Sequence, residues 1–289
     1  MKLLVTGGSG FTGRQVLLRA VAGGHEVLAT VRSAAAADVV RACGAEPVPG
    51  DLDDPAGLDE AFGRGADALI NVASLGFGHA PAVVSAAEDA GLRRAVFVST
   101  TAVATALPAP SKRVRLAAED TIRRSALDWT IVRPTMIYGL PGDRNLSRLL
   151  QLLRRTPVVP LPGGGRRLQQ PVHVQDLAGA LLASVGAAAA SGRTYDVAGP
   201  EPLTFRDLVL TAARAVGRSP RLVPVPLRAT RLALSVYEQV SAHPRLKAEQ
   251  LDRLAEDKAF SIEDARRDLG NDPRSFDAGI RAEAAVLLG

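Results

Sequence analysis

Three glycines near the start of the chain have the spacing of a turn that binds the phosphates of a dinucleotide. Gly7, Gly10 and Gly13 follow an apolar run, 2–5, that predicts a buried strand, and they lead into an amphipathic segment, 14–21, that predicts a helix. In such a turn the first glycine permits the tight bend, the second lets backbone approach a pyrophosphate, and the third allows close packing of helix on sheet. Free N–H groups at a helix start favour an anion, so the pattern predicts a dinucleotide site.

The residues after the second predicted strand, 26–31, bear on the choice of dinucleotide. Sites that bind NAD place an acidic residue there to hold the adenine ribose hydroxyls. This chain has Arg32 and Ser33 instead. An arginine can hold a 2′-phosphate by charge-assisted hydrogen bonds, so the sequence favours NADP(H) over NAD, with an exposed loop arginine as the alternative. Asp51 and Leu52, after the third predicted strand, are expected beside the adenine, although Asp51 can equally cap a helix.

The elements that must position these residues alternate along the first 140 residues. Strands are predicted at 26–31, 46–48, 68–72, 95–99 and 130–133, with helical patterns such as 81–90 and 114–124 between them. The strands are mostly continuous apolar runs, which is typical of parallel strands covered on both faces. The sequence therefore predicts an α/β fold with a doubly wound parallel sheet, a Rossmann fold, and a ligand at the carboxyl ends of its strands.

The pattern changes beyond Gly139. A helix is predicted near 145–154, a Pro/Gly-rich connection at 156–165, short strands at 194–197 and 222–225, and a helix end at the alanine run 187–190. Amphipathic helices are predicted at 228–240 and 247–257, and we assign them to core packing. Three alternatives stay open: these helices can cover a substrate cleft, contact a partner or touch a membrane. We predict an NADP-binding domain at 1–155, to which some later segments can return, and a mainly substrate-binding lobe at 156–289.

Composition narrows the classes of function. The chain has 289 residues, of which 47% are hydrophobic, and its net charge of +5 comes from arginines spread through predicted helices with only 4% aromatic residues. This pattern argues against a nucleic-acid surface. No run of eighteen apolar residues or signal peptide is recognised, so a cytoplasmic protein without membrane contact is expected. Cys43 is the only cysteine and the four histidines lack ligand spacing, so no metal site is expected. A small-molecule substrate and a monomer or homodimer are expected.

Several further segments resemble the short-chain dehydrogenase/reductase superfamily. The likeness is strongest to its extended and atypical branch, which includes sugar-nucleotide epimerases and dehydratases and NADP-binding proteins similar to a complex I accessory subunit. Beside the glycine turn, the matching segments are 50–52, 71–73, 99–101, 132–139, 173–178 and 265–270. The resemblance covers nearly the whole chain and is more specific for fold and cofactor than for reaction. It implies a cofactor site of Thr6, Gly7, Ser9, Gly10, Phe11, Thr12, Gly13, Arg32, Ser33, Asp51, Leu52, Val72, Ala73, Ser74, Ser99, Arg115, Pro134 and Thr135.

The chemistry of that superfamily uses a Ser or Thr, a Tyr, and a Lys four residues after the Tyr. Thr101 matches the first position. The extended branch often has an acid four residues after the Lys; Glu119 matches it, which places Arg115 at the Lys position and Ser111 at the Tyr position. A serine gives up its proton far less readily than a phenol, and an arginine stays protonated, so this pair cannot act as a matched acid and activator. Arg115 can still hold ribose hydroxyls or a substrate anion.

Another proton donor is therefore needed if hydride chemistry occurs. Tyr138 is one candidate, because the loop after the sixth strand approaches the nicotinamide in this family, and His79 in the loop after the fourth strand is a second. The alternatives are a packing role for Tyr138 and a solvated side chain for His79. His173 can line the substrate side, or it can cap or pack.

Two classes of function remain after these observations. The first is an NADP(H)-dependent oxidoreductase or epimerase-type enzyme on a small oxygenated metabolite, such as a sugar derivative or secondary metabolite, or a non-redox reaction in the same cleft. The second is a catalytically silent NADP(H)-binding sensor or scaffold. The missing Tyr and Lys favour the second class, whereas Thr101, His79 and Tyr138 at strand ends, with a complete second lobe, favour the first. The sequence as a whole favours the enzyme.

Overall fold

A seven-stranded parallel sheet forms the first half of the molecule. The computed structural model describes residues 1–107, 110–139, 143, 145–240 and 256–288. The strand order is β11-β6-β5-β4-β1-β2-β3. The strands, all paired in parallel, are β1 (Lys2–Thr6), β2 (Glu26–Val31), β3 (Glu46–Pro49), β4 (Ala68–Asn71), β5 (Arg94–Val98), β6 (Asp128–Pro134) and β11 (Arg193–Val197). This arrangement confirms the predicted doubly wound α/β fold.

Helices cover both faces of this sheet. They are α1 (Phe11–Ala22), α2 (Ala34–Ala42) and α7 (Val174–Gly186) on one face, and α3 (Pro55–Phe62), α4 (Ala80–Asp89) and α5 (Pro110–Arg124) on the other. Successive side chains of a strand point to opposite faces, so Leu3 and Val5 of β1 join the first core while Leu4 joins the second. Both faces are therefore buried, which explains the continuous apolar runs of the sequence.

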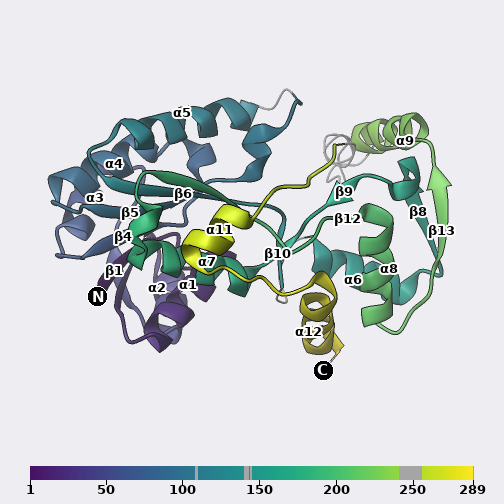
Figure 1. Ribbon diagram of the computed structural model, residues 1–289, viewed down its shortest axis with the longest axis horizontal. Coiled ribbons are helices and arrows are strands. Elements are labelled where there is room, and N and C mark those ends of the chain that lie inside the picture. Colours follow the sequence, from purple (N-terminus) through teal and green to yellow (C-terminus); the bar gives the residue numbers. More distant parts are fainter. Residues whose placement is uncertain (108–109, 140–142, 144, 241–255, 289) are drawn as a thin grey trace.

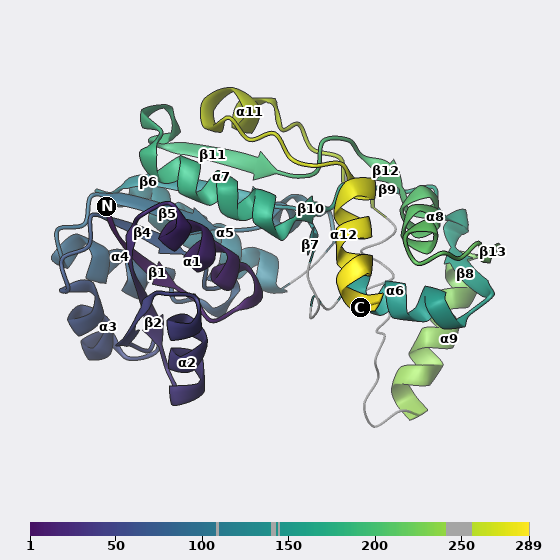
Figure 2. The same cartoon turned by 90° about the horizontal axis from the view of Figure 1, so that it is seen from below.

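Part of the chain beyond residue 155 returns to the sheet. Strand β11 pairs with β6, with Tyr195 opposite Val132. Helix α7 packs against α1, and the short helix α11 (Glu263–Leu269) contacts both α7 and β11. Figure 2 shows β11, α7 and α11 together on the side of the sheet that carries α1.

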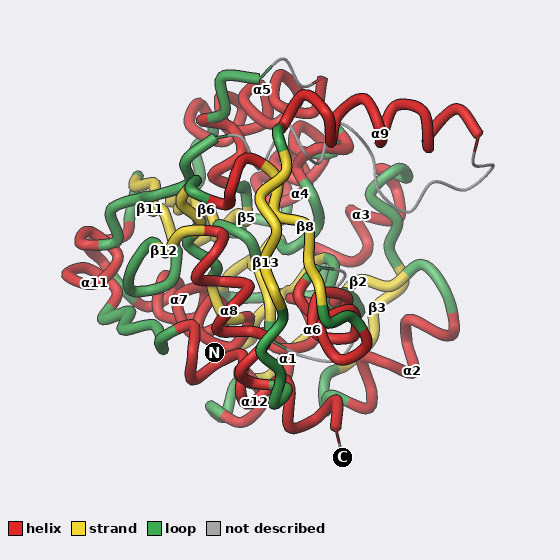
Figure 3. Tube along the Cα trace, turned by 90° about the vertical axis from the view of Figure 1, so that its right-hand side faces the viewer, coloured by secondary structure: helices red, strands yellow, loops and turns green. Residues whose placement is uncertain are grey.

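The second lobe lies beyond one end of the sheet (Figure 1). Its helices are α6 (Leu146–Arg155), α8 (Phe205–Ala215), α9 (Leu227–Val240) and α12 (Phe276–Leu288). Its strand pairs are β7 (Ile137–Tyr138) with β10 (Val172–His173), β9 (Leu168–Gln169) with β12 (Leu203–Thr204), and β8 (Val158–Pro162) with β13 (Arg221–Val225), the last two side by side in Figure 3. A third apolar core joins α6, α8 and α12.

The sequence located most of these elements, with differences at their ends. Helix α5 begins at Pro110, four residues before the predicted start, because its first turn carries no apolar periodicity. The alanine run forms a 3₁₀ turn, Ala188–Ala190, just after α7. Most of the helix predicted at 247–257 lies outside the described residues. None of the described helices is both long and apolar enough to span a bilayer.

Candidate functional site

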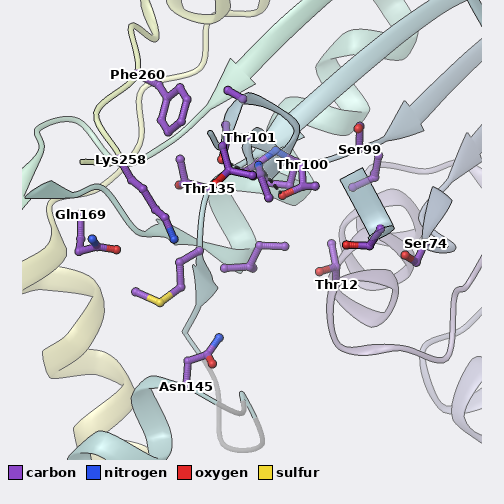
Figure 4. Close-up of a pocket in the computed structure, with 18 of the residues that line it drawn as sticks. Thr12, Ser74, Ser99, Thr100, Thr101, Thr135, Asn145, Gln169, Lys258 and Phe260 are labelled. Carbon is purple, nitrogen blue, oxygen red and sulfur yellow. Dashed lines mark hydrogen bonds between the residues drawn. The ribbon is translucent and has the colours of Figure 1, made fainter. Parts of the chain in front are cut away.

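One large cavity opens between the sheet and the second lobe. It has a volume of about 1600 Å³, and its walls include the glycine turn, the loops after β4, β5 and β6, the start of α5, and residues 145–152 and 256–260. Figure 4 shows Thr12, Ser74 and Ser99 on one side, Thr100, Thr101 and Thr135 in the middle, and Gln169, Lys258 and Phe260 on the other side. The cavity thus lies at the carboxyl ends of the strands, where a doubly wound sheet binds its ligand.

The glycine turn leaves a space beside its backbone that a Cβ atom at Gly7 or Gly13 would fill. Gly7 has a φ of +70°, and a Cβ added there would lie 2.8 Å from the Ala73 nitrogen. A Cβ on Gly13 would lie 2.1 Å from the Gly7 oxygen, so this position must be glycine for α1 to pack. The Arg14 N–H donates to the Gly10 carbonyl at 2.9 Å, the first bond of the helix, and Gly10 offers no capping side chain. The preceding N–H groups are available to an anion, so the cradle fits a dinucleotide phosphate.

Gly10, Phe11 and Thr12 line the cavity together with Gly7 and Gly13. Ser9, predicted with them, is half-buried in the same turn without lining the cavity.

The loop after β4 is held beside this turn by two hydrogen bonds, one buried and one half-buried. The Thr6 hydroxyl donates to Asn71 Oδ1 at 2.6 Å, and Asn71 Nδ2 donates to the Ala73 carbonyl at 3.1 Å. Thr6 and Ala73 therefore support the cavity wall without lining it, whereas Val72 and Ser74 line it directly. Ser99, Pro134 and Thr135, predicted for the cofactor, also line the cavity.

Arg32 and Asp51 lie together at the edge of the nucleotide-binding half. Arg32 directly follows β2, its Nη1 lies 4.0 Å from Asp51 Oδ1, and the two side chains are 69% and 41% exposed. Ser33 caps α2, because its Oγ accepts a hydrogen bond from the Ala36 N–H at 3.2 Å. Asp51 Oδ1 accepts from the Asp53 N–H at 3.2 Å, and Leu52 packs against the core. None of these residues lines the cavity itself: Arg32 and Ser33 follow β2, the strand beside β1, and Asp51 and Leu52 follow β3, the next strand.

Three of the predicted catalytic residues, Thr101, Ser111 and Arg115, line this cavity. Thr101 begins a 3₁₀ turn after β5, is buried, and donates its hydroxyl proton to the Pro134 carbonyl at 3.2 Å. Ser111 and Arg115 line the same cavity from the first half of α5. Arg115 Nη1 lies 3.4 Å from the Ser111 carbonyl, and a Cβ on Gly76 would lie 2.9 Å from Arg115 Nη2. The start of α5 therefore rests closely on the loop after β4.

Glu119, one helical turn beyond Arg115, anchors α5 to the strand ends. Its carboxylate is fully buried and accepts hydrogen bonds from Ser99 Oγ at 2.6 Å, Arg133 Nε at 2.9 Å and Arg123 Nη2 at 2.7 Å. Burial alone would raise the pKa of Glu119, but the bonds from Arg133 and Ser99 outweigh it and lower the pKa below its ordinary value. Glu119 stays charged and joins α5 to β5 and β6.

Tyr138 does not reach the cavity. It is only 1% exposed, its ring makes an edge contact with the His173 ring at a centroid distance of 5.3 Å, and its hydroxyl has no hydrogen-bond partner among the described residues. Burial raises the pKa of Tyr138, and a Cβ on Gly279 of α12 would lie 2.1 Å from its hydroxyl oxygen. This position supports the packing role and does not support the expected role as proton donor.

His79 and His173 do not line the cavity either. His79 precedes α4, and its Nδ1 lies 3.4 Å from Asp53 Oδ1. His173 is buried and caps α7, because its Nδ1 accepts from the Gln175 N–H at 3.3 Å; burial lowers its pKa. Neither side chain lines the cavity, so the structure does not bring them to Thr101. The described residues contain no group of three or more His, Cys, Asp or Glu side chains that could hold a metal ion.

The segment 256–260 supplies cavity residues that sequence reasoning missed. The Lys258 N–H donates to the Leu168 carbonyl at 2.9 Å, and the Phe260 N–H donates to Gln170 Oε1 at 2.8 Å. Glu256 accepts from the Thr105 hydroxyl and, at 2.9 Å, from the Ala106 N–H. These partners are about 90 and 150 residues away along the chain. One sequence signal pointed to the segment 256–260: the alternative that an amphipathic helix at 247–257 covers a substrate cleft.

Comparisons with known proteins agree with this geometry. A family model described as NAD(P)H-binding matches residues 7–151. The (4-alkanoyl-5-oxo-2,5-dihydrofuran-3-yl)methyl phosphate reductase of Streptomyces griseus is 32% identical in sequence to this chain, and the match covers 80% of each chain. The 4-hydroxy-2-methyl-3-oxo-4-farnesyl-3,4-dihydroquinoline-1-oxide ketoreductase of Stigmatella aurantiaca is 29% identical, covering 93% of this chain and 91% of its own.

A solved structure extends the likeness to the whole fold. UDP-glucose 4-epimerase of Thermus thermophilus, in complex with NAD, superposes with a TM-score of 0.75 at 20% identity, covering 100% of this chain and 99% of its own. At that identity the match concerns the fold, which includes the second lobe. The family model, which matches half of the chain, shows that this chain belongs to the NAD(P)H-binding family.

Proposed function

We propose that this protein is an NADP(H)-dependent oxidoreductase that reduces a carbonyl group of a small oxygenated metabolite. One observation carries the proposal: a single cavity connects the glycine turn, Thr101 with Ser111 and Arg115, and the wall of the second lobe. A cofactor and a substrate can therefore occupy one space. The relatives named as reductases support the same class of reaction.

The residues present fit the dinucleotide. The N–H groups of Phe11, Thr12 and Gly13 at the start of α1 would hold the pyrophosphate. Arg32 and Ser33 would hold a 2′-phosphate, which is the basis for proposing NADP(H) rather than NAD. The nicotinamide half would lie along Val72, Ser74, Ser99, Pro134 and Thr135 toward Thr101.

The chain's own groups prepare the substrate carbonyl. NADPH, when bound, supplies the hydride that adds to the carbonyl carbon. Thr101 can turn its hydroxyl from the Pro134 carbonyl to the substrate oxygen, which receives the carbonyl electron pair. The Arg115 cation stabilises the negative charge that develops on this oxygen. A proton from solvent, relayed by the hydroxyls of Ser111 and Thr101, completes the alcohol.

No phenol takes part in this scheme. Tyr138 and Tyr195 do not line the cavity, and the side chain of Tyr237 lies outside the part that the structure describes. The same observation favours a second candidate, a silent NADP(H) sensor, in which Arg115 holds the ribose and no hydride is transferred.

The experiment that separates the two candidates is a turnover assay. The purified chain is mixed with NADPH and a panel of ketones and 3-oxo compounds, and the loss of reduced nicotinamide absorbance is followed. We expect turnover with part of the panel and, for Thr101→Ala, a loss of about tenfold or more in kcat with an unchanged Kd for NADPH. Thr121→Ala is the matched control: Thr121 is a half-buried threonine in the second half of α5 that does not line the cavity, and its hydroxyl donates to the Ala117 carbonyl at 3.0 Å. Tight NADPH binding without turnover of any compound would support the sensor.

A further inference from the structure

A second, smaller cavity lies at the C-terminal ends of two helices of the second lobe. It has a volume of about 200 Å³ and is lined by Gln151, Arg154, Arg155 and Arg218. The first three stand at positions i, i+3 and i+4 of α6, so their side chains share one face of that helix. Arg218 comes from the segment after α8, which packs beside α6 (Figure 1). We call this cavity the arginine pocket.

The backbone around the arginine pocket is held in place. The Arg218 N–H donates to the Ala213 carbonyl at 2.9 Å, which closes the turn at the end of α8. The Arg221 N–H donates to the Pro157 carbonyl at 2.8 Å and so joins the chain after α8 to the chain after α6. The fold therefore brings the arginines together before any ligand arrives, which lowers the entropic cost of binding one.

The three guanidinium groups have no anionic partner in the part of the chain that the structure describes. Their side chains are exposed and form no ion pair or hydrogen bond there. The segments that carry them, 145–175 and 208–236, contain no Asp or Glu at all. By contrast, Arg274 pairs with Asp176 at 2.8 Å. The pocket thus holds positive charge that the neighbouring side chains do not balance.

The helix ends offset only part of this charge. Arg154 and Arg155 lie in the last turn of α6, where a cation interacts favourably with the helix dipole. A helix C-terminus carries about half of an elementary negative charge. The ends of α6 and α8 therefore offset about one of the three positive charges, and about two remain. Because like charges repel, an anion among them would be stabilised.

We propose that the arginine pocket is a second anion site, which binds a phosphate or diphosphate group. Guanidinium groups present planar forks of N–H donors that match phosphate oxygens, and the Gln151 amide offers one more donor group. Gln151 is the one described residue that lines both this pocket and the large cavity, so the site is separate from the glycine turn and from Thr101. The inference does not depend on the proposed reaction.

Calorimetric titration of the full chain with pyrophosphate tests the site. The buffer is free of phosphate and low in salt, and excess NADPH occupies the glycine turn. We expect Arg154→Gln and Arg218→Gln each to weaken pyrophosphate binding about tenfold, because each removes a charge-assisted hydrogen bond. Pyrophosphate should raise the Tm of the unchanged chain and leave that of the double variant unchanged.

A second double variant controls for net charge. Arg93→Gln with Arg113→Gln removes the same charge at two exposed arginines that line neither cavity. It should leave the affinity for pyrophosphate within about twofold of the unchanged chain. An equal loss in the two double variants would overturn the inference, since the binding would then follow net charge and not the pocket.

Sedimentation with vesicles distinguishes two sources of the phosphate group. Vesicles of phosphatidylcholine with and without phosphatidic acid are mixed with the unchanged chain and with both double variants. Sedimentation that needs phosphatidic acid and is lost in Arg154→Gln with Arg218→Gln, but not in the control, identifies a lipid headgroup. A response of the pyrophosphate titration alone identifies a soluble phosphate compound. No pocket-dependent response in either measurement would overturn the inference and leave the proposed function untouched.

Discussion

Arg115 and Ser111 face the cavity at the positions where the family resemblance leads one to expect a lysine and a tyrosine. Arginine keeps its proton at any ordinary pH, so it can stabilise a negative charge but cannot exchange a proton with the substrate. The only tyrosine near the expected loop, Tyr138, is buried against Gly279 and His173. At the scale of single residues, the cavity therefore has a guanidinium and an aliphatic hydroxyl where the family resemblance implies a lysine and a phenol.

Arg32 leads to a prediction about cofactor choice. Arg32→Ala should weaken NADPH binding about tenfold and leave NADH binding unchanged, because only NADPH carries the 2′-phosphate that the guanidinium would hold. Calorimetric titration of both nucleotides measures the effect. Arg41→Ala is the matched control, an exposed arginine on α2 paired with Asp38. Equal affinities of the unchanged chain for the two nucleotides would contradict the prediction.

Glu283 leads to a prediction about stability and pH. Its side chain is fully buried, accepts from Ser147 Oγ at 2.6 Å and lies beside Asp143, and burial raises its pKa to about 8. The folded protein therefore holds this proton between about pH 4.5 and 8, where the unfolded chain releases it. The free energy of unfolding should fall as pH rises through this window, by at most about 1.4 kcal/mol per unit.

Glu283→Gln should remove this dependence, because an amide does not titrate. Urea unfolding at pH 5, 6.5 and 8 measures it. The control is Glu263→Gln, an exposed acid paired with Arg266, which should keep the slope of the unchanged protein. An identical slope in Glu283→Gln would show that this carboxyl does not hold the proton.

At the scale of elements, helix α5 carries Ser111 and Arg115, and Glu119 fixes its position. Glu119→Ala would leave half-buried Arg133 and buried Ser99 without their shared partner. We expect a loss of about 3 kcal/mol in the free energy of unfolding, the cost of breaking a buried ion pair on one side. Where the variant folds, kcat should fall more than the affinity for NADPH, because α5 is displaced from Thr101.

Unfolding in urea and steady-state kinetics measure the two effects of Glu119→Ala. Asp120→Ala is a control on the same helix, since Asp120 forms an exposed pair with Arg124 and should contribute less than about 1 kcal/mol. Similar losses in the two variants would mean that the buried network does not position α5.

At the scale of the whole molecule, the cavity exists because two parts of the chain meet across it. Glu256 joins the second-lobe side to Thr105 and Ala106 in the loop after β5. Glu256→Ala should raise the KM for substrate severalfold while the Kd for NADPH is unchanged, because the glycine turn lies on the other side of the cavity. Steady-state kinetics and nucleotide titration measure both, with exposed Glu201→Ala as control. An unchanged KM would show that this contact does not close the substrate side.

Local pattern was sufficient for the nucleotide-binding half. Gly7, Gly10 and Gly13 act through backbone geometry within one turn, and the apolar runs around them report strands buried on both faces. These signals lie within a few residues of one another, so the sequence alone predicted the parallel sheet, the cofactor cradle and the place of Thr101 at a strand end.

Only the tertiary structure decided which side chains reach the cavity. Tyr138 and Lys258 are each compatible with a cavity or a surface when read locally, and their positions follow from contacts with α12 and with Leu168 far along the chain. The placement of β11 beside β6 has the same origin. Whether a side chain is buried or reaches the cavity depends on packing between distant segments, and the periodicity of a short segment carries no information about such packing. The glycine turn depends instead on the backbone of consecutive residues, which the local sequence specifies directly.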